Sequence, residues 1–292
     1  MKKLIIAVLA LLPAFAFAND VVLKTETTVK VDKAQVNVKD QASLQNGAKL
    51  FMNYCAGCHS TQYQRYNRVA KDLGIPEDVM QANLNFTGVP VGELMKNAIP
   101  AKDAAEWFGA APPDLTLVGR VRGANWLYTY LRTFYVDEER PFGVNNIIFP
   151  SVGMPHVLEP LQGRQTAQVT KLTKGQDDAQ WTNEDGTISW DNAQLKDAIK
   201  DSAVVHKQTT QNADTAAKTE HVTLTRLSSN GRGELSADEF DKAALDIVNF
   251  LAYSADPVKL ERHRIGYWVL GFLVIFFIFG YLLKKEYWRD VH

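Results

Sequence analysis

A Cys-x-x-Cys-His motif is formed by Cys55, Cys58 and His59. Its residue types and their spacing are suited to binding a metal-containing cofactor. The motif is typical of covalent attachment of a c-type haem, in which each thiol adds to a haem vinyl group. The histidine is placed to ligate the iron. The chain of 292 residues has only these two cysteines, so no other cysteine framework competes for them. The motif predicts one covalently bound haem c.

Two other kinds of site use a Cys-x-x-Cys pair. A thioredoxin-like redox pair would follow a strand in a βαβ pattern, which the surrounding sequence lacks. A zinc site would need two further ligands at suitable spacing, and the chain has no second Cys/His pair. The motif therefore favours haem over both.

Whether the haem iron has a sixth ligand distinguishes electron carriers, whose iron is fully coordinated, from enzymes, whose iron keeps an open coordination position. Met154 is the strongest candidate, because Gly153 and Pro155 shape a loop that could lay its thioether over the iron. Met52 lies three residues before Cys55, too near to reach the opposite haem face. The soft sulfur of a methionine ligand favours Fe(II) and raises the reduction potential.

His156 is the named rival of Met154. Bis-histidine ligation would lower the potential, but Pro155 is expected to turn the His156 imidazole away. Met80 and Met95 lie in segments with helical spacing, where methionine is more often a core residue. Three other histidines lie in polar or juxtamembrane contexts typical of surface residues: His206, His221 and His263.

Several elements are expected to position these groups. Apolar residues recur at the helical period over residues 44–54, which predicts a helix that delivers the chain into the motif. A second helix is expected within residues 125–135, and residues 140–163 read as a loop. Ser236 and Glu239 form a capping box that opens a further helix. Two segments lack such periodicity and are expected to be extended, flexible or peripheral: residues 19–41 and 164–224.

The two ends of the chain predict on which side of a membrane the haem lies. Residues 1–18 read as a secretory signal with cleavage before Asn19. Residues 265–283 carry no charge and as a helix cover about 28 Å, enough to cross a hydrocarbon core. Three Lys or Arg residues flank each end of the span, so their count gives no orientation. The signal predicts instead that residues 19–264 are exported and residues 284–292 form a cytoplasmic tail.

Composition limits the range of partners. The chain has 32 Lys and Arg against 33 Asp and Glu, a net charge of −1, which argues against nucleic acid as a partner. Partly buried haem propionates need donors, and Arg120 and Arg122 are candidates, with a solvated arginine as the alternative.

Six motifs occur in the order of a known family: Cys55-Ala-Gly-Cys-His59, Pro112-Pro-Asp-Leu115, Arg120-Val-Arg122, Trp126-Leu-Tyr-Thr-Tyr130, Gly153-Met-Pro-His156 and Asp246-Ile-Val-Asn-Phe-Leu251. With the single C-terminal span, the chain closely resembles cytochrome c1, the haem subunit of the bc1 complex, or quinol–cytochrome c reductase. The resemblance covers residues 44–162 and 233–288, and leaves out residues 19–41 and most of 164–224.

The resemblance implies a mainly α-helical haem domain of the class I cytochrome c type with insertions. It implies Met154 as the sixth ligand and favours Arg122 over Arg120 as the propionate partner. The haem would accept electrons from the Rieske iron–sulfur subunit and pass them to a soluble or anchored cytochrome c. Cytochrome b would carry the quinol sites, within a dimeric complex of a bacterial inner membrane whose haem domains lie in the periplasm.

Three other functions stay open from the sequence. A free-standing membrane-anchored cytochrome c could donate electrons to a terminal oxidase. An open iron would indicate a peroxidase-like or gas-sensing protein, and a redox-inactive haem a structural anchor. Acidic residues that could steer a basic cytochrome c are Asp137, Glu138, Glu139, Asp177 and Asp178.

Overall fold

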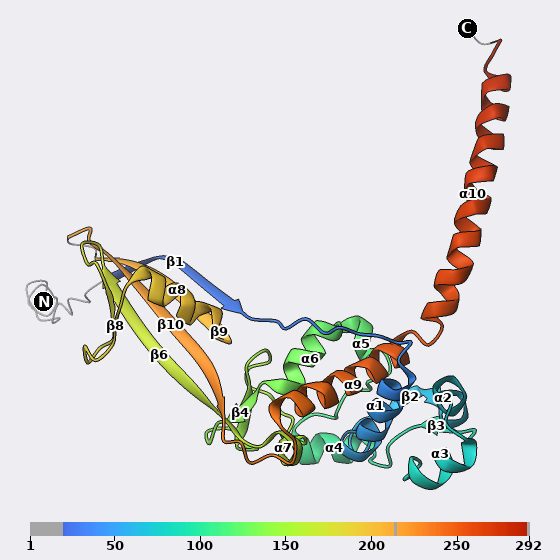
Figure 1. Ribbon diagram of the computed structural model, residues 1–292, viewed down its shortest axis with the longest axis horizontal. Helices are drawn as coiled ribbons and strands as arrows, with labels where there is room; N and C mark the ends of the chain where they lie inside the picture. Colours follow the sequence, from blue (N-terminus) through green and yellow to red (C-terminus); the bar gives the residue numbers. More distant parts are fainter. Residues whose placement is uncertain (1–19, 213–214, 291–292) are drawn as a thin grey trace, which may run out of the picture. The chain divides into compact units, whose positions relative to one another are not determined.

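The computed structural model describes residues 20–212 and 215–290 of the chain (Figure 1). The expected signal peptide, residues 1–18, and its cleavage site before Asn19 lie outside these residues. The chain divides into two compact units. The helical unit contains residues 31–164 and the chain from Ser229 onward, and the sheet unit contains the chain up to Lys30 and residues 165–228.

The helical unit carries the predicted haem motif. Its helices are α1 (Gln41–Tyr54), α2 (Tyr66–Leu73), α3 (Glu77–Asn83), α4 (Ala101–Phe108), α5 (Val118–Val121), α6 (Ala124–Arg132), α7 (Glu159–Gln162), α9 (Ala237–Ala255) and α10 (Lys259–Tyr287). Two short antiparallel pairs complete it: β2 (Thr61–Arg65) with β3 (Leu94–Met95), and β4 (Phe134–Val136) with β5 (Val144–Asn146). The helices expected at residues 44–54 and 125–135 are confirmed as α1 and α6, although the chain turns into strand β4 from Phe134.

The packing of α1 against α9 organises this unit. The Ser236 hydroxyl accepts a hydrogen bond from the Glu239 N–H and the Glu239 carboxylate accepts one from the Ser236 N–H, which confirms the expected capping box at the start of α9. At the contact, Gly47 lies so close to α9 that a Cβ atom would be 2.0 Å from the Asp246 carbonyl oxygen. Only glycine permits the two backbones to approach this closely.

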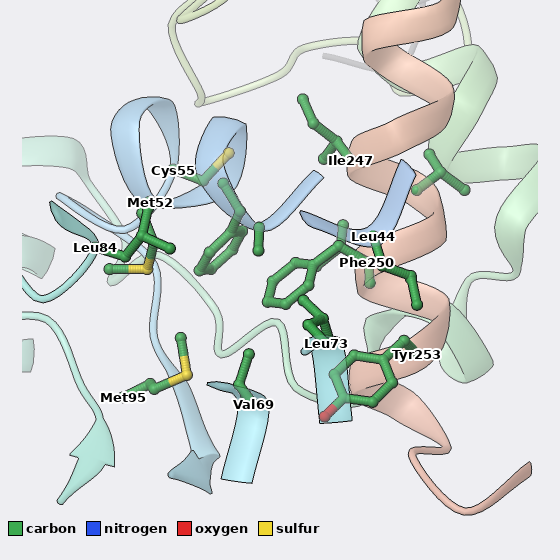
Figure 2. Packing of buried hydrophobic residues seen from close by; sticks show 14 of the residues in the cluster. Leu44, Met52, Cys55, Val69, Leu73, Leu84, Met95, Ile247, Phe250 and Tyr253 are labelled. Carbon is green, nitrogen blue, oxygen red and sulfur yellow. The ribbon is translucent and has the colours of Figure 1, made fainter. Parts of the chain in front are cut away.

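A buried apolar core fills the space between α1, α2, α3 and α9 (Figure 2). Phe51 and Phe250 lie on facing helices with ring centroids 5.3 Å apart. Cys55 is part of the same core at the end of α1. The first predicted haem-attachment position is therefore part of the main apolar core of the unit.

The sheet unit is an antiparallel arrangement in the order β1-β9-β10-β6-β7-β8. The strands are β1 (Asp20–Val29), β6 (Gln165–Gly175), β7 (Trp181–Thr182), β8 (Ser189–Trp190), β9 (Val204–Asn212) and β10 (Lys218–Ser229), with one helix, α8 (Asn192–Lys200). A small core of Leu172, Trp181, Leu195, Val205 and Leu224 binds α8 to the strands.

The sheet corrects the expectation of a mainly α-helical chain. Strands make up 21% and helices 42% of the residues, so the architecture combines both kinds of element. On β10 the buried Val222 and Leu224 alternate with half-buried threonines, which is the period-2 pattern of a strand. Because the segment is rich in threonine and has few apolar residues, its sequence indicated a strand only weakly, although β-branched threonine itself favours strands. The proposed domain boundaries, including the insertion at 164–224, stay a prediction.

Helix α10 contains the expected membrane span. It has 29 residues with a mean hydropathy of 2.2 in its most apolar window, and none of that window is buried in the protein. A core helix of a soluble protein would be covered by its neighbours. At ~1.5 Å per residue, α10 is about 44 Å long, which matches a bilayer including its headgroup layers.

Candidate haem site

The attachment motif forms one continuous turn at the end of α1. The Cys55 N–H donates to the Phe51 carbonyl at 2.8 Å and so still belongs to the helix. The N–H groups of Cys58 and His59 both donate to the Cys55 carbonyl, at 3.1 Å and 2.8 Å. This turn brings the two thiols and the imidazole together within five residues.

The two thiols are free, and their environments differ. Cys55 is buried and Cys58 is half-buried. Burial, with a smaller effect of neighbouring Cys58, raises the pKa of the Cys55 thiol to about 12. Thioredoxin-like cysteines work as thiolates with a lowered pKa, so the Cys55 environment disfavours that alternative.

The orientation of His59 is fixed by a carbonyl group. Its Nδ1 lies 2.8 Å from the Pro113 carbonyl oxygen. Because a carbonyl oxygen only accepts hydrogen bonds, Nδ1 carries the proton, and the lone pair of Nε2 is left for a metal. The pKa of His59 is lowered mainly by burial, an effect that the Pro113 carbonyl and Asp114 oppose. The neutral imidazole is the form that ligates iron.

The Pro113 carbonyl is itself held rigidly. The Leu115 N–H donates to the Ser60 carbonyl at 2.8 Å. The Asp114 carboxylate accepts from the N–H groups of Gln62 at 2.8 Å and Thr116 at 3.0 Å. Proline fixes φ at this turn, so the turn at residues 112–115 positions the partner of the predicted iron ligand.

A cavity of about 280 Å³ lies beside the attachment motif. Its lining includes Ala56, Gly57 and His59 from the motif. Asn97 also lines the cavity, and its side-chain amide donates to the Cys58 carbonyl. Sequence reasoning missed Asn97, which has no motif to mark it and lies 39 positions from its partner.

Met154 lies in a loop that is held at several points. Ser151 adopts a left-handed conformation, with φ of 62°, that is rare for residues other than glycine. Its N–H donates to the Asn145 side chain at 2.8 Å, and its carbonyl accepts from Arg140 Nη2 at 2.9 Å. Val152 is buried against Phe134. These contacts fix the backbone immediately before the predicted sulfur ligand.

Tyr130 connects Met154 with the rest of the helical unit. Its hydroxyl donates to the Met154 sulfur at 3.3 Å, and its ring stacks on Trp126 with centroids 4.8 Å apart. Burial raises the pKa of Tyr130 to about 12, so the hydroxyl keeps its proton at neutral pH. The sequence placed Tyr130 on an aromatic helix and assigned it no role at the site.

The three other methionine candidates occupy core positions, whereas His156 is half-buried. Met52, Met80 and Met95 are all buried within the main core, as expected of core methionines, and Figure 2 shows Met52 and Met95 there. The His156 ring lies flat against Phe134, with centroids 4.9 Å apart and an interplanar angle of 2°. Met154, in contrast to the other three methionines, is half-buried and outside the main core.

The two candidate propionate partners point to different surroundings. The Arg122 guanidinium lies over the rings of Trp126, at 5.0 Å, and Phe149, at 5.8 Å. It forms no ion pair with any residue that the structure describes. Arg120 lies instead beside Asp256, with Nη1 3.9 Å from Oδ2. Arg122 is thus the guanidinium held among the aromatic residues around Tyr130.

The donor set fits a c-type haem. Two free thiols, an imidazole with its Nε2 lone pair available and a thioether in a rigid loop are the groups that such a haem requires. The apolar core around Cys55 and the aromatic group of Trp126, Tyr130 and Phe149 supply surfaces suited to an apolar ring.

A helical unit with this donor set, followed by a single apolar helix long enough to cross a bilayer, defines a membrane-anchored c-type cytochrome. The sequence matches the profile of the cytochrome c1 family over residues 32–291. The chain belongs to the cytochrome c1 family, the haem subunits of bc1 complexes, whose members carry a covalently bound haem c and transfer electrons. The matched range includes residues 164–224, which the six motifs had left out.

Curated relatives agree with this assignment. Cytochrome c1 of Allochromatium vinosum is 44% identical over 292 residues, all of both chains. A protein named ammonia monooxygenase gamma subunit, from Nitrosomonas europaea, is 38% identical over 97% of both chains. Cytochrome c1 of Blastochloris viridis is 24% identical over 86% of this chain and 82% of its own.

Proposed function

We propose that this chain accepts single electrons from a Rieske iron–sulfur subunit and passes them to a cytochrome c on the periplasmic side of a bacterial inner membrane. The observation that carries this proposal is the donor set: His59 with a free Nε2 at one position and Met154, held by Tyr130, at another. A histidine–methionine pair is typical of electron-transferring c-type haems.

Each residue of the site has a role in this proposal. Cys55 and Cys58 would hold the haem through thioether bonds, and His59 and Met154 would ligate its iron. When bound, the haem supplies a one-electron Fe(III)/Fe(II) couple. The Pro113 carbonyl keeps the His59 imidazole in one tautomer. Arg122 pairs with a propionate, since it is free of carboxylate partners among the described residues, whereas Arg120 lies next to Asp256.

Occupied ligand positions determine the kind of chemistry. With His59 and Met154 both bound to iron, no coordination position would be left for a substrate. We therefore propose outer-sphere electron transfer, with quinol oxidation left to cytochrome b in a dimeric complex.

The acidic residues proposed to steer cytochrome c are not equivalent. Glu138 and Glu139 are exposed on the turn between β4 and β5, whereas the Asp137 carboxylate accepts a hydrogen bond from Asn145 at 2.8 Å. Asp178 accepts from the Gly175 N–H at 2.7 Å. Glu138 and Glu139, like the exposed Asp177, are thus freer than Asp137 and Asp178 to meet a basic partner.

The test is purification of the full-length chain through a C-terminal tag in a mild detergent. Co-purification of b-type haem, a Rieske centre and inhibitor-sensitive quinol–cytochrome c reductase activity would support the proposal. A c-type spectrum without b haem or quinol activity, from membranes whose other complexes remain intact, would instead support the alternative, a free-standing cytochrome that donates to an oxidase.

A second association is suggested by the Nitrosomonas relative, whose name describes a monooxygenase subunit. The same purification separates the two associations, because co-purification of monooxygenase subunits in place of cytochrome b would contradict membership of a bc1 complex. The full-length similarity to cytochrome c1 of Allochromatium vinosum favours the bc1 complex.

A further inference from the structure

A second cavity of about 280 Å³ lies where α9 ends and the membrane helix α10 begins. Its lining includes three cationic side chains and one carboxylate: Arg120, Lys259, Arg262 and Asp256. The formal excess is therefore two positive charges. Of these residues only Arg120 was a candidate for the haem site, and it lies beside Asp256 and not among the aromatic residues around Tyr130.

The backbone brings these charges together through one close approach. A Cβ atom on Gly119 would lie 2.6 Å from the Leu251 carbonyl oxygen of α9. Because glycine lets α5 contact α9 directly, Arg120 on α5 faces the junction that leads into α10. Ala252 adds a small apolar surface to the cavity.

The charges are only partly compensated. Arg262 Nη2 donates to Asp256 Oδ2, and Arg120 Nη1 lies 3.9 Å from the same oxygen. Lys259 is half-buried and forms no ion pair with any described residue. The nearby Glu261 is paired with Arg264 at 3.6 Å and is not part of the cavity lining. The Arg120 and Arg262 side chains are 62% and 54% exposed, so all three cations can reach an anionic ligand at the mouth of the cavity.

The depth of the cavity in the membrane indicates the kind of anion. Lys259 and Arg262 precede the uncharged stretch at Ile265 by six and three residues, or about 9 and 4.5 Å of helix. The headgroup layer of a bilayer is roughly 5–7 Å thick on each side. With the hydrocarbon region beginning at Ile265, Arg262 would lie at headgroup depth and Lys259 just outside the headgroup layer. Tyr267 and Trp268, exposed on α10, are typical of this interface.

We infer that this cavity binds the phosphate group of an anionic phospholipid. Two guanidinium groups and an ammonium group suit a phosphate diester, and the N-terminal end of α10 adds a favourable dipole because no side chain caps it. Arg120 would thus bind lipid phosphate, while Arg122 serves the haem.

The test is native mass spectrometry of the full-length, haem-loaded chain in detergent, titrated with phosphatidylglycerol or phosphatidylcholine. We expect phosphatidylglycerol to bind preferentially, and the variant R120Q/K259Q to bind it about 30-fold more weakly, since each interfacial cation contributes roughly 1 kcal/mol. Arg262 is left unchanged so that Asp256 keeps its partner. The matched control K171Q/K196Q removes two exposed cations of the sheet unit that form no ion pair with any described residue, and it should keep the preference.

Two further measurements sharpen the result. Asp256→Asn removes the competing negative charge and should strengthen phosphatidylglycerol binding. An unchanged c-type haem spectrum shows that each variant is folded. The inference is overturned if R120Q/K259Q binds phosphatidylglycerol as tightly as the wild type, or if inorganic phosphate displaces the lipid at equal concentration. Loss of a protein subunit from the purified complex, without loss of lipid, would also overturn it by indicating a protein partner.

Discussion

The Tyr130 hydroxyl donates a hydrogen bond to the Met154 sulfur across 3.3 Å. Tyr130 lies on α6 and Met154 in the loop before α7, 24 residues further along the chain. Tyr130 packs against both the main core and the small cluster of Phe134, Val144 and Val152. This contact fixes the predicted sulfur ligand relative to the core that anchors Cys55.

Removal of the Tyr130 hydroxyl should lower the reduction potential of the haem. A donor on the sulfur reduces its donation to ferric iron, so Tyr130→Phe should stabilise the ferric state. A neutral hydrogen bond contributes roughly 0.5–1.5 kcal/mol, which corresponds to about 20–65 mV for one electron. Potentiometric titration of the purified protein measures the change. Tyr63→Phe, at a side chain that is 71% exposed, is the control and should leave the potential unchanged.

Met154→Leu should open the sixth coordination position. Leucine conserves volume, and such exchanges cost less than about 1.5 kcal/mol, so the fold should persist while the ferrous protein gains the ability to bind carbon monoxide. Optical difference spectra detect this binding. Met80→Leu makes the same exchange at a buried core position and should leave the ferrous protein inert to carbon monoxide. If Met154→Leu stays inert and Met80→Leu does not, the ligand assignment is wrong.

His156 should make the protein less stable in acid. Burial lowers the pKa of His156 from 6.5 to about 4. The His156 imidazole is therefore protonated near pH 6.5 in the unfolded chain, but only near pH 4 in the folded chain. The free energy of unfolding falls as the pH drops through this range and then levels off. The full effect is about 3 kcal/mol.

The measurement that checks this is the free energy of unfolding of wild type and His156→Phe between pH 7.5 and pH 4. Phenylalanine keeps an aromatic ring against Phe134 but does not titrate. The variant should therefore lose less stability on acidification, whatever its stability at pH 7.5. Parallel pH profiles for the two proteins would contradict the prediction.

Gly47→Ala should destabilise the helical unit strongly. The new Cβ atom would lie 2.0 Å from the Asp246 carbonyl oxygen, which belongs to the backbone of α9 and has no freedom to move alone. Overpacking of this kind costs about 1–3 kcal/mol or more. Thermal unfolding and the yield of haem-loaded protein both measure the loss.

The matched control is Gly92→Ala. Its new Cβ atom would meet only the Asn67 side-chain nitrogen at 3.9 Å, an ordinary contact. We expect wild-type haem content and little change in the unfolding temperature. Equal losses in both variants would show that the α1–α9 approach is not the cause.

The sequence by itself determined the features that depend on neighbouring residues. The spacing of Cys55, Cys58 and His59, the capping box at Ser236 and the uncharged run at 265–283 are all local patterns. Such patterns carry their chemistry within a few residues, because thioether attachment, helix capping and bilayer length each depend on one short segment. The resemblance to cytochrome c1 depended on the same kind of short motif.

Only the tertiary structure decided which distant groups meet. The Pro113 carbonyl reaches His59 across 54 positions, and Tyr130 reaches Met154 across 24. Arg120 and Arg122 are two residues apart, yet one lies beside Asp256 and the other over Trp126. The sheet could not be predicted from the sequence because its strands bury few apolar residues. Tertiary packing determines these contacts, because the neighbours of a side chain belong to helices and strands that are distant in the sequence.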